Sequence, residues 1–277
     1  MGEGAGVIDL HTHSTASDGQ YPPAEVAARA AAAGTVVWSL TDHDTVAGQA
    51  AAAAAARERG VRFVPGIELS VFLDEKEIHV LGHFVDPAHP TLSRFEDFLA
   101  DRRRERMGEI VRRLAALGVH VTPDDIVAYS GGKTIGRPHV ARAIVAAGAA
   151  ATVKDAFDRY LGEGRPAYVG RYRLTAEQAV ELVRGAGGVA TLAHPGVSKV
   201  GRDELGRLRR MGFDGLEVRH PEHSPGQVES LRRAAAELGL VPTAGTDFHG
   251  PAINPGRELG GSDMAASDLA ALEARRP

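Results

Sequence analysis

The stretch Val7-Ile8-Asp9-Leu10-His11-Thr12-His13 is a short apolar run that leads directly into a His-x-His pair. Similar apolar runs recur along the chain and alternate with stretches of helical periodicity. We expect strands at Val7–Leu10, Val36–Leu40, Arg62–Pro65, Ile78–Val85, Gly188–Ala193, Gly215–Val218 and Leu240–Ala244. This alternation predicts an α/β fold whose parallel strands are joined by helices, as either an open sheet or a barrel.

The composition limits the function classes that need to be considered. The chain has 277 residues, of which 43% are hydrophobic and 25% charged, which is typical of a globular protein. The formal net charge of −4 argues against a broad basic surface, so we expect no stable duplex nucleic-acid partner. The absence of cysteine excludes disulfides, thiolate metal sites and cysteine nucleophiles.

The sequence also gives expectations about location. The N-terminus lacks the basic and apolar regions of a signal peptide. No apolar stretch reaches the length of about 18–20 residues that spans a bilayer, so we expect a cytoplasmic protein without a membrane partner. The sequence carries no signal for the oligomeric state.

One segment interrupts the alternation of strands and helices. Between residues 91 and 165 the apolar residues recur at helical spacing, as at Phe95, Phe98 and Leu99. Thr122 followed by Asp125 resembles a capped helix start. We therefore predict a helical insertion at 91–165, which divides a barrel into a first part at 1–90 and a second part at 166–277.

Every predicted strand ends in, or next to, a side chain that can bind a metal ion. These side chains are His11, His13, Asp18, His43, Glu68, His79, His83, His194, His220, His223, Asp247 and His249. Because the carboxyl ends of parallel strands converge at one mouth of a barrel, these groups should meet there. Alternate residues of a strand point the same way, so His11 and His13 can bind one ion.

Simpler explanations exist for each of these residues taken alone. A single buried histidine is more often a hydrogen-bonded core residue than a ligand. An acidic residue after a strand often caps the next helix, as we expect of Asp44 before a helix at Thr45–Arg59. The same explanation is much less plausible at seven separate strand ends, so the sequence predicts a multinuclear metal site.

The motifs resemble those of the polymerase and histidinol phosphatase (PHP) family of metal-dependent phosphoesterases. The resemblance covers Val7 to about Gly250 and rests on these segments: Asp9-Leu10-His11-Thr12-His13-Ser14, Thr41-Asp42-His43-Asp44-Thr45, Gly66-Ile67-Glu68, Ala193-His194-Pro195 and Gly245-Thr246-Asp247-Phe248-His249. The insertion segment Gly136-Arg137-Pro138-His139 resembles one branch of this family. That branch contains the 3′,5′-nucleoside bisphosphate phosphatases and the related 5′-to-3′ exoribonucleases.

The resemblance implies a distorted seven-stranded β/α barrel that carries three divalent metal ions. The ligand sets that it implies are His11, His13, Glu68 and Asp247 for the first ion, Glu68, His79 and His194 for the second, and Asp18, His43 and His249 for the third. His83 is the alternative to His79. Manganese is the expected metal, and iron or zinc also suit imidazole and carboxylate ligands.

Further polar residues are candidates for binding the substrate or for catalysis. Arg137 and His139 lie at an expected helix start, where an anion is favoured, although a plain helix cap would look the same. Arg102, Arg103 and Arg106 continue an apolar helix stripe, unless they form a solvated face. His220 and His223 can contact phosphate or protonate the leaving group, and a polar loop is an equal alternative.

The resemblance implies hydrolysis of the 3′-phosphate of nucleoside 3′,5′-bisphosphates to give 5′-nucleotides. It also implies 5′-to-3′ exonuclease activity at the 5′ end of short phosphorylated RNA. A histidinol phosphatase or a general phosphomonoesterase of the same family remains an alternative. A metal-dependent amidohydrolase and a non-catalytic nucleotide sensor are alternatives from other classes, although the additional Asp18, His43 and Glu68 argue against the first of these.

Overall fold

The computed structural model describes residues 6–129 and 136–277. The chain forms two compact units, one made of residues up to Arg94 and from Arg173 onward, and the other of Phe95–Tyr172. The boundaries expected from the sequence, at 90/91 and 165/166, lie a few residues before these limits. Each unit is described below by itself.

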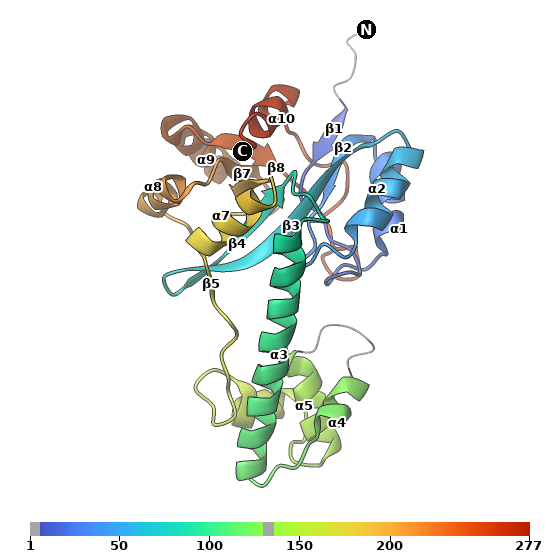
Figure 1. The fold of residues 1–277 in the computed structure, drawn as a ribbon, viewed down its shortest axis with the longest axis vertical. Helices are drawn as coiled ribbons and strands as arrows, with labels where there is room; N and C mark the ends of the chain where they lie inside the picture. Colours follow the sequence, from blue (N-terminus) through green and yellow to red (C-terminus); the bar gives the residue numbers. More distant parts are fainter. Residues whose placement is uncertain (1–5, 130–135) are drawn as a thin grey trace. The chain divides into compact units, whose positions relative to one another are not determined.

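The larger unit is built on a single sheet (Figure 1). Its strands are β1 (Val7–Asp9), β2 (Thr35–Leu40), β3 (Arg62–Leu73), β4 (Lys76–His83), β5 (Leu174–Thr175), β6 (Val189–Leu192), β7 (Gly215–Arg219) and β8 (Val241–Ala244). They follow the order β1-β2-β3-β4-β6-β7-β8, and β5 pairs with β3. The Leu10 N–H donates to Ala244 O at 3.2 Å and the Asp247 N–H to His11 O at 2.8 Å, so the two edges meet at the carboxyl ends of β1 and β8. The α/β class is confirmed. The structure adds one strand, the two-residue β5, to the seven that were predicted.

Strand β4 corrects the prediction that all strands are parallel. Strand β3 continues past Pro65 to Leu73, and β4 pairs antiparallel with both β3 and β6. A two-residue turn at Asp74 and Glu75 joins β3 to β4, whereas a parallel pair needs a crossover of a dozen or more residues. As a result, Glu68 and His79 lie within strands and not beyond strand ends.

Six of the helices in the described residues lie wholly within the larger unit. They are α1 (Pro23–Ala32), α2 (Gln49–Glu58), α7 (Ala176–Gly185), α8 (Arg202–Met211), α9 (Pro225–Leu238) and α10 (Ala266–Glu273). Helices α8 and α9 end at Gly212 and Gly239, which adopt the left-handed conformation that favours glycine. The expected role of Asp44 is wrong, because α2 starts after Gly48 without a side-chain cap, and Asp44 accepts a hydrogen bond from the Ser70 N–H instead.

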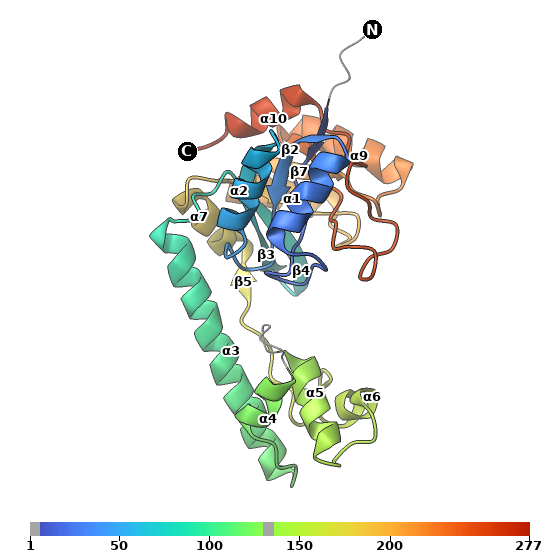
Figure 2. The same cartoon turned by 90° about the vertical axis from the view of Figure 1, so that its right-hand side faces the viewer.

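Two apolar clusters hold the helices of this unit against its sheet. Helices α1 and α2 lie side by side (Figure 2) and bury Val26, Ala30 and Ala52 against Trp38 and Leu40 of β2. A second cluster joins Leu269 and Leu272 of α10 to apolar residues of β1, β2, β3, β6 and β8. The strands that carry the polar residues of the predicted metal site are therefore held in place by apolar packing against α1, α2 and α10.

The smaller unit has its own apolar core. It contains most of α3 (Pro90–Ala116), together with α4 (Pro123–Ala128), α5 (Arg137–Ala146), α6 (Val153–Ala156) and a π-helical turn, η1 (Phe157–Leu161). Ile110 and Leu114 of α3 pack against Ile126, Val140 and Ile144. The expected capping box is confirmed, since Thr122 and Asp125 exchange hydrogen bonds at the start of α4. Among the described helices, including the long α3, none is apolar enough to cross a membrane.

Candidate metal centre

Three overlapping groups of histidines and carboxylates lie at the carboxyl end of the sheet. Within each group, one possible ligand atom from every member lies within 4.8 Å of the others. The groups are His11, His13, Glu68 and Asp247; His43, Glu68 and His79; and His13, Asp18, His43 and His249. Because Glu68, His13 and His43 each belong to two groups, the structure brings these residues into one continuous cluster.

Glu68 occupies the middle of this cluster. Its side chain is 1% exposed, and histidine nitrogens surround both carboxylate oxygens. Oε1 lies 2.9 Å from Nδ1 of His79 and 3.2 Å from Nε2 of His194. Oε2 lies 3.3 Å from Nε2 of His11, 3.1 Å from Nε2 of His13 and 3.1 Å from Nδ1 of His43. This is the arrangement needed if a carboxylate is to bridge two ions.

The chain leaving β1 contributes the two innermost histidines. The Nε2 atoms of His11 and His13 lie 3.1 Å apart, and both rings are fully buried. Asp247 Oδ1 lies 3.3 Å from the first of these nitrogens and 3.1 Å from the second. Asp9 fixes this arrangement, since it accepts hydrogen bonds from the main-chain N–H and the hydroxyl of Thr246.

The structure places His79 in the cluster and His83 outside it. His83 is fully buried, and its Nε2 lies 2.9 Å from Leu10 O while its Nδ1 lies 3.3 Å from Thr191 Oγ1. Both ring nitrogens of His83 are thus engaged in contacts that hold β4 against β1 and β6. Burial lowers the pKa of His83 to about 4, so the ring is neutral at physiological pH.

The outer part of the cluster is formed by Asp18, His43 and His249. The Asp18 side chain is 56% exposed, and its oxygens lie 3.3 Å from Nε2 of His249 and 3.9 Å from Nε2 of His43. The His249 ring stacks on that of His13 with centroids 4.0 Å apart. Asp18 and the 24% exposed His43 therefore lie nearer to solvent than the group around His11, whereas His249 is buried.

The carboxylates and histidines of the cluster shift one another's pKa values toward the charged forms. Burial by itself would lower the pKa of His13 and His79, but neighbouring carboxylates outweigh it and raise these values to about 9 and about 10. Burial would raise the pKa of Glu68, but His43 and His11 foremost hold it well below its usual range. Glu68 is therefore ionised, and its negative charge favours a cation, either a proton on a neighbouring histidine or a metal ion, at this position.

These residues fit a group of divalent cations. The buried Oε2 of Glu68 and the Nδ1 atoms of His13 and His43 have no hydrogen-bond partner among the described residues. Buried polar atoms normally have partners, and here they gather where several ligand atoms converge. Imidazole mixed with carboxylate is a ligand set for manganese, iron or zinc.

His220 and Arg257 flank the cluster at Asp247. His220 is buried, its Nε2 lies 3.2 Å from Asp247 Oδ2, and its Nδ1 accepts a hydrogen bond from the Glu222 N–H. Arg257 donates to the same carboxylate and to Glu222. Arg257 is not recognisable from the sequence, because it lies in a polar loop after the last motif.

His223 has a different environment from His220. Its Nδ1 lies 3.0 Å from Val218 O, and its Nε2 accepts a hydrogen bond from the Gly196 N–H at 3.1 Å. Burial lowers the pKa of this ring, which matches a neutral imidazole with one donor and one acceptor nitrogen. Both nitrogens thus connect main-chain segments after β6 and within β7.

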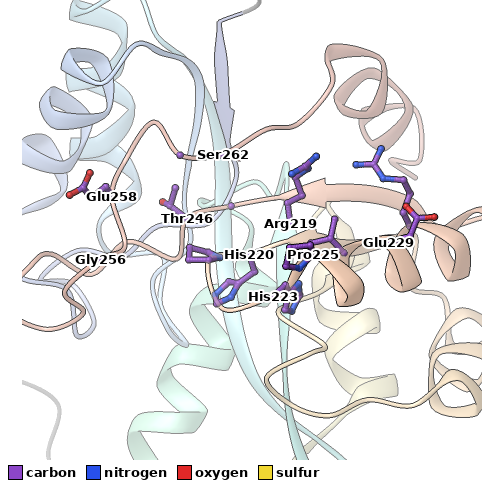
Figure 3. A pocket seen from close by; sticks show the side chains of 14 residues that line it. Arg219, His220, His223, Pro225, Glu229, Thr246, Gly256, Glu258 and Ser262 are labelled. Atoms are coloured by element: carbon purple, nitrogen blue, oxygen red, sulfur yellow. The ribbon is translucent and has the colours of Figure 1, made fainter.

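A cavity of about 830 Å³ borders the cluster at His220 (Figure 3). Its walls come from the end of β7, the start of α9 and the loop after β8, with Arg219, Thr246 and Ser262 among the lining residues. The buried Arg219 Nε and Ser262 Oγ have no hydrogen-bond partner among the residues that the structure describes. The cavity is thus a polar space that reaches a residue in contact with Asp247.

The remaining candidate residues all lie in the smaller unit. The Arg137 guanidinium lies 5.3 Å from the Tyr168 ring centroid and 5.9 Å from that of Phe157. His139 Nδ1 accepts a hydrogen bond from the Gly136 N–H at the start of α5, which ties this ring to the helix terminus.

The three arginines of α3 differ in their surroundings. Arg102 is exposed and pairs with Glu105 at 2.7 Å, whereas Arg103 is partly buried. The half-buried Arg106 donates from Nε to Val169 O at 2.9 Å. Burial and the charge of Arg137 lower the pKa of Arg106, so the structure brings these two cations near each other and leaves Arg102 on the surface.

Known proteins resemble this chain over most of its length. Residues 9–112 match the PHP domain family. The chain is 38% identical over 258 residues to a 3′,5′-nucleoside bisphosphate phosphatase of Chromobacterium violaceum, covering 91% of this chain and 90% of that protein. It is 36% identical over 247 residues to a 5′-3′ exoribonuclease of Haemophilus influenzae, covering 88% and 90%. A solved structure of a metal-dependent phosphoesterase from Bifidobacterium adolescentis matches with a TM-score of 0.76 at 31% identity, covering 99% of this chain and 97% of that one.

The fold and the cluster define the class of protein. A β/α sheet that gathers histidines and carboxylates at one end is the framework of a metal-dependent hydrolase. The chain belongs to the PHP family of metal-dependent phosphoesterases and is therefore a phosphoric ester hydrolase. This confirms the family resemblance drawn from the sequence motifs.

Proposed function

We propose that this protein removes the 3′-phosphate of nucleoside 3′,5′-bisphosphates to give 5′-nucleotides, using three divalent ions, manganese foremost, in the cytoplasm. The same chemistry extends to short 5′-phosphorylated RNA, whose first 3′ linkage is a phosphodiester beside a 5′-phosphate. The observation that carries the proposal is the central position of Glu68 between overlapping ligand groups. The named activities of two relatives support the choice of substrate, and this chain matches each of them over about nine-tenths of the relative's length.

The proposed ligand sets are those implied by the family resemblance, and they overlap the groups in the cluster. They differ from those groups in two places, since His43 and not His194 is grouped with Glu68 and His79, and the outer group also includes His13. His11, His13, Glu68 and Asp247 hold the first ion; Glu68, His79 and His194 hold the second; Asp18, His43 and His249 hold the third. Bound ions of this kind neutralise phosphate charge, activate water and stabilise the displaced oxygen. Glu68 contributes to two sets because its two oxygens face different histidines.

His220 is the residue that we expect to contact the reacting phosphate or its leaving oxygen. Its Nδ1 accepts from the Glu222 N–H, so the one ring proton lies on Nε2, beside Asp247 Oδ2. A ring with a single proton cannot give it up as a general acid, so the expected part of His220 is to donate a hydrogen bond from Nε2. His223 cannot do the same without breaking a main-chain contact, and its expected part is to hold the loop after β6.

The smaller unit supplies the proposed site for the second phosphate. Arg137 stands in the first turn of α5, where the positive end of the helix dipole favours an anion. Arg106 and Arg137 lie near each other although their charges repel, and a phosphate between them would relieve this repulsion. His139 adds a ring whose Nε2 is left for the substrate, because its Nδ1 accepts from Gly136. We include Arg102 and Arg103 in this region as weaker contributors.

A panel of substrates with manganese tests the proposed function. The panel contains adenosine 3′,5′-bisphosphate, short 5′-phosphorylated RNA, histidinol phosphate, nitrophenyl phosphate and an amide substrate. We expect the bisphosphate to give 5′-AMP with the highest kcat/KM, and the RNA to release mononucleotides in sequence. A preference for histidinol phosphate, for nitrophenyl phosphate or for the amide would establish one of the alternatives. Binding of the bisphosphate without turnover would identify a sensor.

Replacement of Arg137 tests the second phosphate site. Arg137→Ala should weaken transition-state stabilisation by about 2–4 kcal/mol, the range for one well-placed charged donor. Arg159→Ala is the matched control, since Arg159 also lies on an aromatic ring of the smaller unit, 4.8 Å from the Tyr160 centroid. If kcat/KM falls by the same factor and Tm falls by the same amount in both variants, Arg137 serves the fold and the assignment is wrong.

A further inference from the structure

Glu217 is a buried carboxylate that none of the motifs includes. It lies in the middle of β7 between the apolar residues Leu216 and Val218, and it is 1% exposed. Burying an ionised carboxylate costs free energy unless hydrogen bonds and opposite charges compensate it. Its surroundings should therefore show what this residue is for.

The two oxygens of Glu217 contact two different residues of the cluster. Oε1 lies 3.0 Å from Nδ1 of His11, and Oε2 accepts a hydrogen bond from the His194 main-chain N–H at 2.7 Å. His11 follows β1 and His194 follows β6, so one side chain on β7 connects residues from two other strands. Neither contact uses the nitrogen that faces the candidate ions.

The contact with His11 determines which ring nitrogen carries the proton. An ionised carboxylate can only accept, so Nδ1 keeps its proton when His11 loses the one on Nε2, as a metal ligand must. The lone pair of Nε2 is then directed at the space beside Glu68 and Asp247, whose oxygens each lie 3.3 Å away. A histidine that binds a metal commonly donates its other N–H to such a partner.

The contact with His194 acts on the main chain. His194 has φ of 26°, in the left-handed region that is costly for a residue other than glycine. The hydrogen bond from its N–H to Glu217 helps to offset this cost and holds the turn in which Nε2 approaches Glu68 to 3.2 Å. Close packing leaves little freedom here, since a Cβ on Gly245 would lie 2.9 Å from Glu217 Oε1.

We propose that Glu217 is a positioning residue of the metal centre, which orients the imidazole of His11 and the main chain of His194 so that both rings face the ions. This inference rests on the metal centre proposed above and is independent of the substrate. It assigns Glu217 no contact with the ions or with the reacting phosphate.

Glu217→Gln is the informative variant because the two side chains have the same shape. Glutamine offers one acceptor and one NH₂ donor where the wild-type residue offers two acceptors. If the NH₂ faces His11, the ring proton moves to Nε2 and blocks that ligand; if it faces His194, two N–H groups oppose each other. Asp214→Asn is the matched control. Asp214 is also a buried acid, 4% exposed, but it directly precedes β7 and pairs with Arg184 at 2.5 Å.

Zinc binding to the metal-free proteins, measured in competition with a chromophoric chelator, tests the proposal. We expect Glu217→Gln to weaken zinc binding by about 10- to 100-fold and Asp214→Asn to leave it unchanged. Equal zinc binding by wild type and Glu217→Gln overturns this inference alone. Failure of wild type to bind zinc overturns the metal centre itself, so the two outcomes are distinct.

A second measurement covers the case in which Glu217→Gln does not fold, which circular dichroism would show. Nitrogen-15 NMR of zinc-loaded wild type reports the state of each histidine nitrogen. We expect His11 to carry a proton on Nδ1 and zinc on Nε2. Zinc on Nδ1 of His11, or a His11 ring without a hydrogen-bonded Nδ1 proton, contradicts the proposal.

Discussion

At the scale of single residues, the function depends on polar groups that are buried at a cost. Glu68 is almost fully buried among five histidines, at the centre of the proposed metal groups. Without a cation, such a cluster has to be held together by protons shared among its histidines. The same side chains that bind metal therefore bind protons when the metal is removed.

Replacing Glu68 should be more damaging than replacing any single histidine of the cluster. Glu68→Ala removes a ligand that the proposal assigns to two ions, whereas a histidine variant removes one ligand from one ion. We expect elemental analysis to find close to three divalent ions per wild-type chain and a larger loss in Glu68→Ala than in His79→Ala. A wild-type value of one ion or fewer in an active sample would rule out the three-metal proposal.

Metal binding should release protons near neutral pH. In the metal-free protein the pKa values of His13 and His79 are raised to about 9 and about 10, so both rings are protonated at neutral pH. A nitrogen that binds a metal must lose its proton, and a rise in pH removes this competition. Apparent metal affinity should therefore increase from neutral pH toward the raised pKa values. Calorimetry in buffers of different ionisation enthalpy measures the protons released, and a pH-independent affinity would contradict this account.

The sequence predicted the ligand residues better than their partners. His11, His13 and Asp247 are recognisable because polar residues that directly follow an apolar strand stand out from its pattern. Glu217 offered a weaker signal, as one acid within an apolar strand, and Arg257 offered none. Their roles depend on which loops meet in three dimensions, and periodicity along the chain carries no information about that.

At the scale of elements, the hairpin of β3 and β4 is what brings Glu68 and His79 together as diagonal neighbours, since Glu68 pairs with Leu81. Leu69 pairs with Val80 and Ser70 with His79, so the antiparallel register sets the separation of the two ligands. The sequence indicated both strands, but their lengths and directions were wrong because the turn at Asp74 has no glycine to mark it. Asp74 adopts φ of 56° and pairs with Arg207 at 2.7 Å, a long-range contact that supports the turn.

The junction between β8 and β1 should tolerate no additional side-chain volume. A Cβ on Gly245 would lie 2.2 Å from Cβ of His11, so Gly245→Ala must displace a proposed ligand. We expect a loss of about 1–3 kcal/mol in the free energy of unfolding, the usual cost of overpacking, together with reduced metal content. Chemical denaturation of the metal-free proteins measures the first effect.

Gly226→Ala is the control for this prediction. Gly226 lies in α9, and a Cβ there would meet no atom within 4 Å. Replacing a helical glycine by alanine should increase stability by about 0.5–1 kcal/mol. If Gly245→Ala proved as stable as Gly226→Ala and kept its metal, the close packing at this junction would not matter for the site.

At the scale of the whole molecule, the chain divides the proposed work between two units. The larger unit contains all of the proposed metal ligands, and the smaller unit contains Arg106, Arg137 and His139. The α/β class and the helical insertion could be predicted because both follow from periodicity and from interrupted alternation. The part that the insertion's charges play in substrate binding could not be predicted, since periodicity does not show which ligand a charged side chain meets.

The central claim is that the protein recognises two phosphates and cleaves one of them. A remote phosphate adds binding energy that can align the reacting one, so its removal should lower the rate of the chemical step as well as binding. The most direct test compares kcat/KM for adenosine 3′,5′-bisphosphate with that for 3′-AMP, which lacks only the 5′-phosphate, in the presence of manganese. We predict a markedly higher value for the bisphosphate in the wild-type protein and a much smaller difference in Arg137→Ala. Equal values for both substrates in the wild-type protein would contradict the claim and identify a general phosphatase.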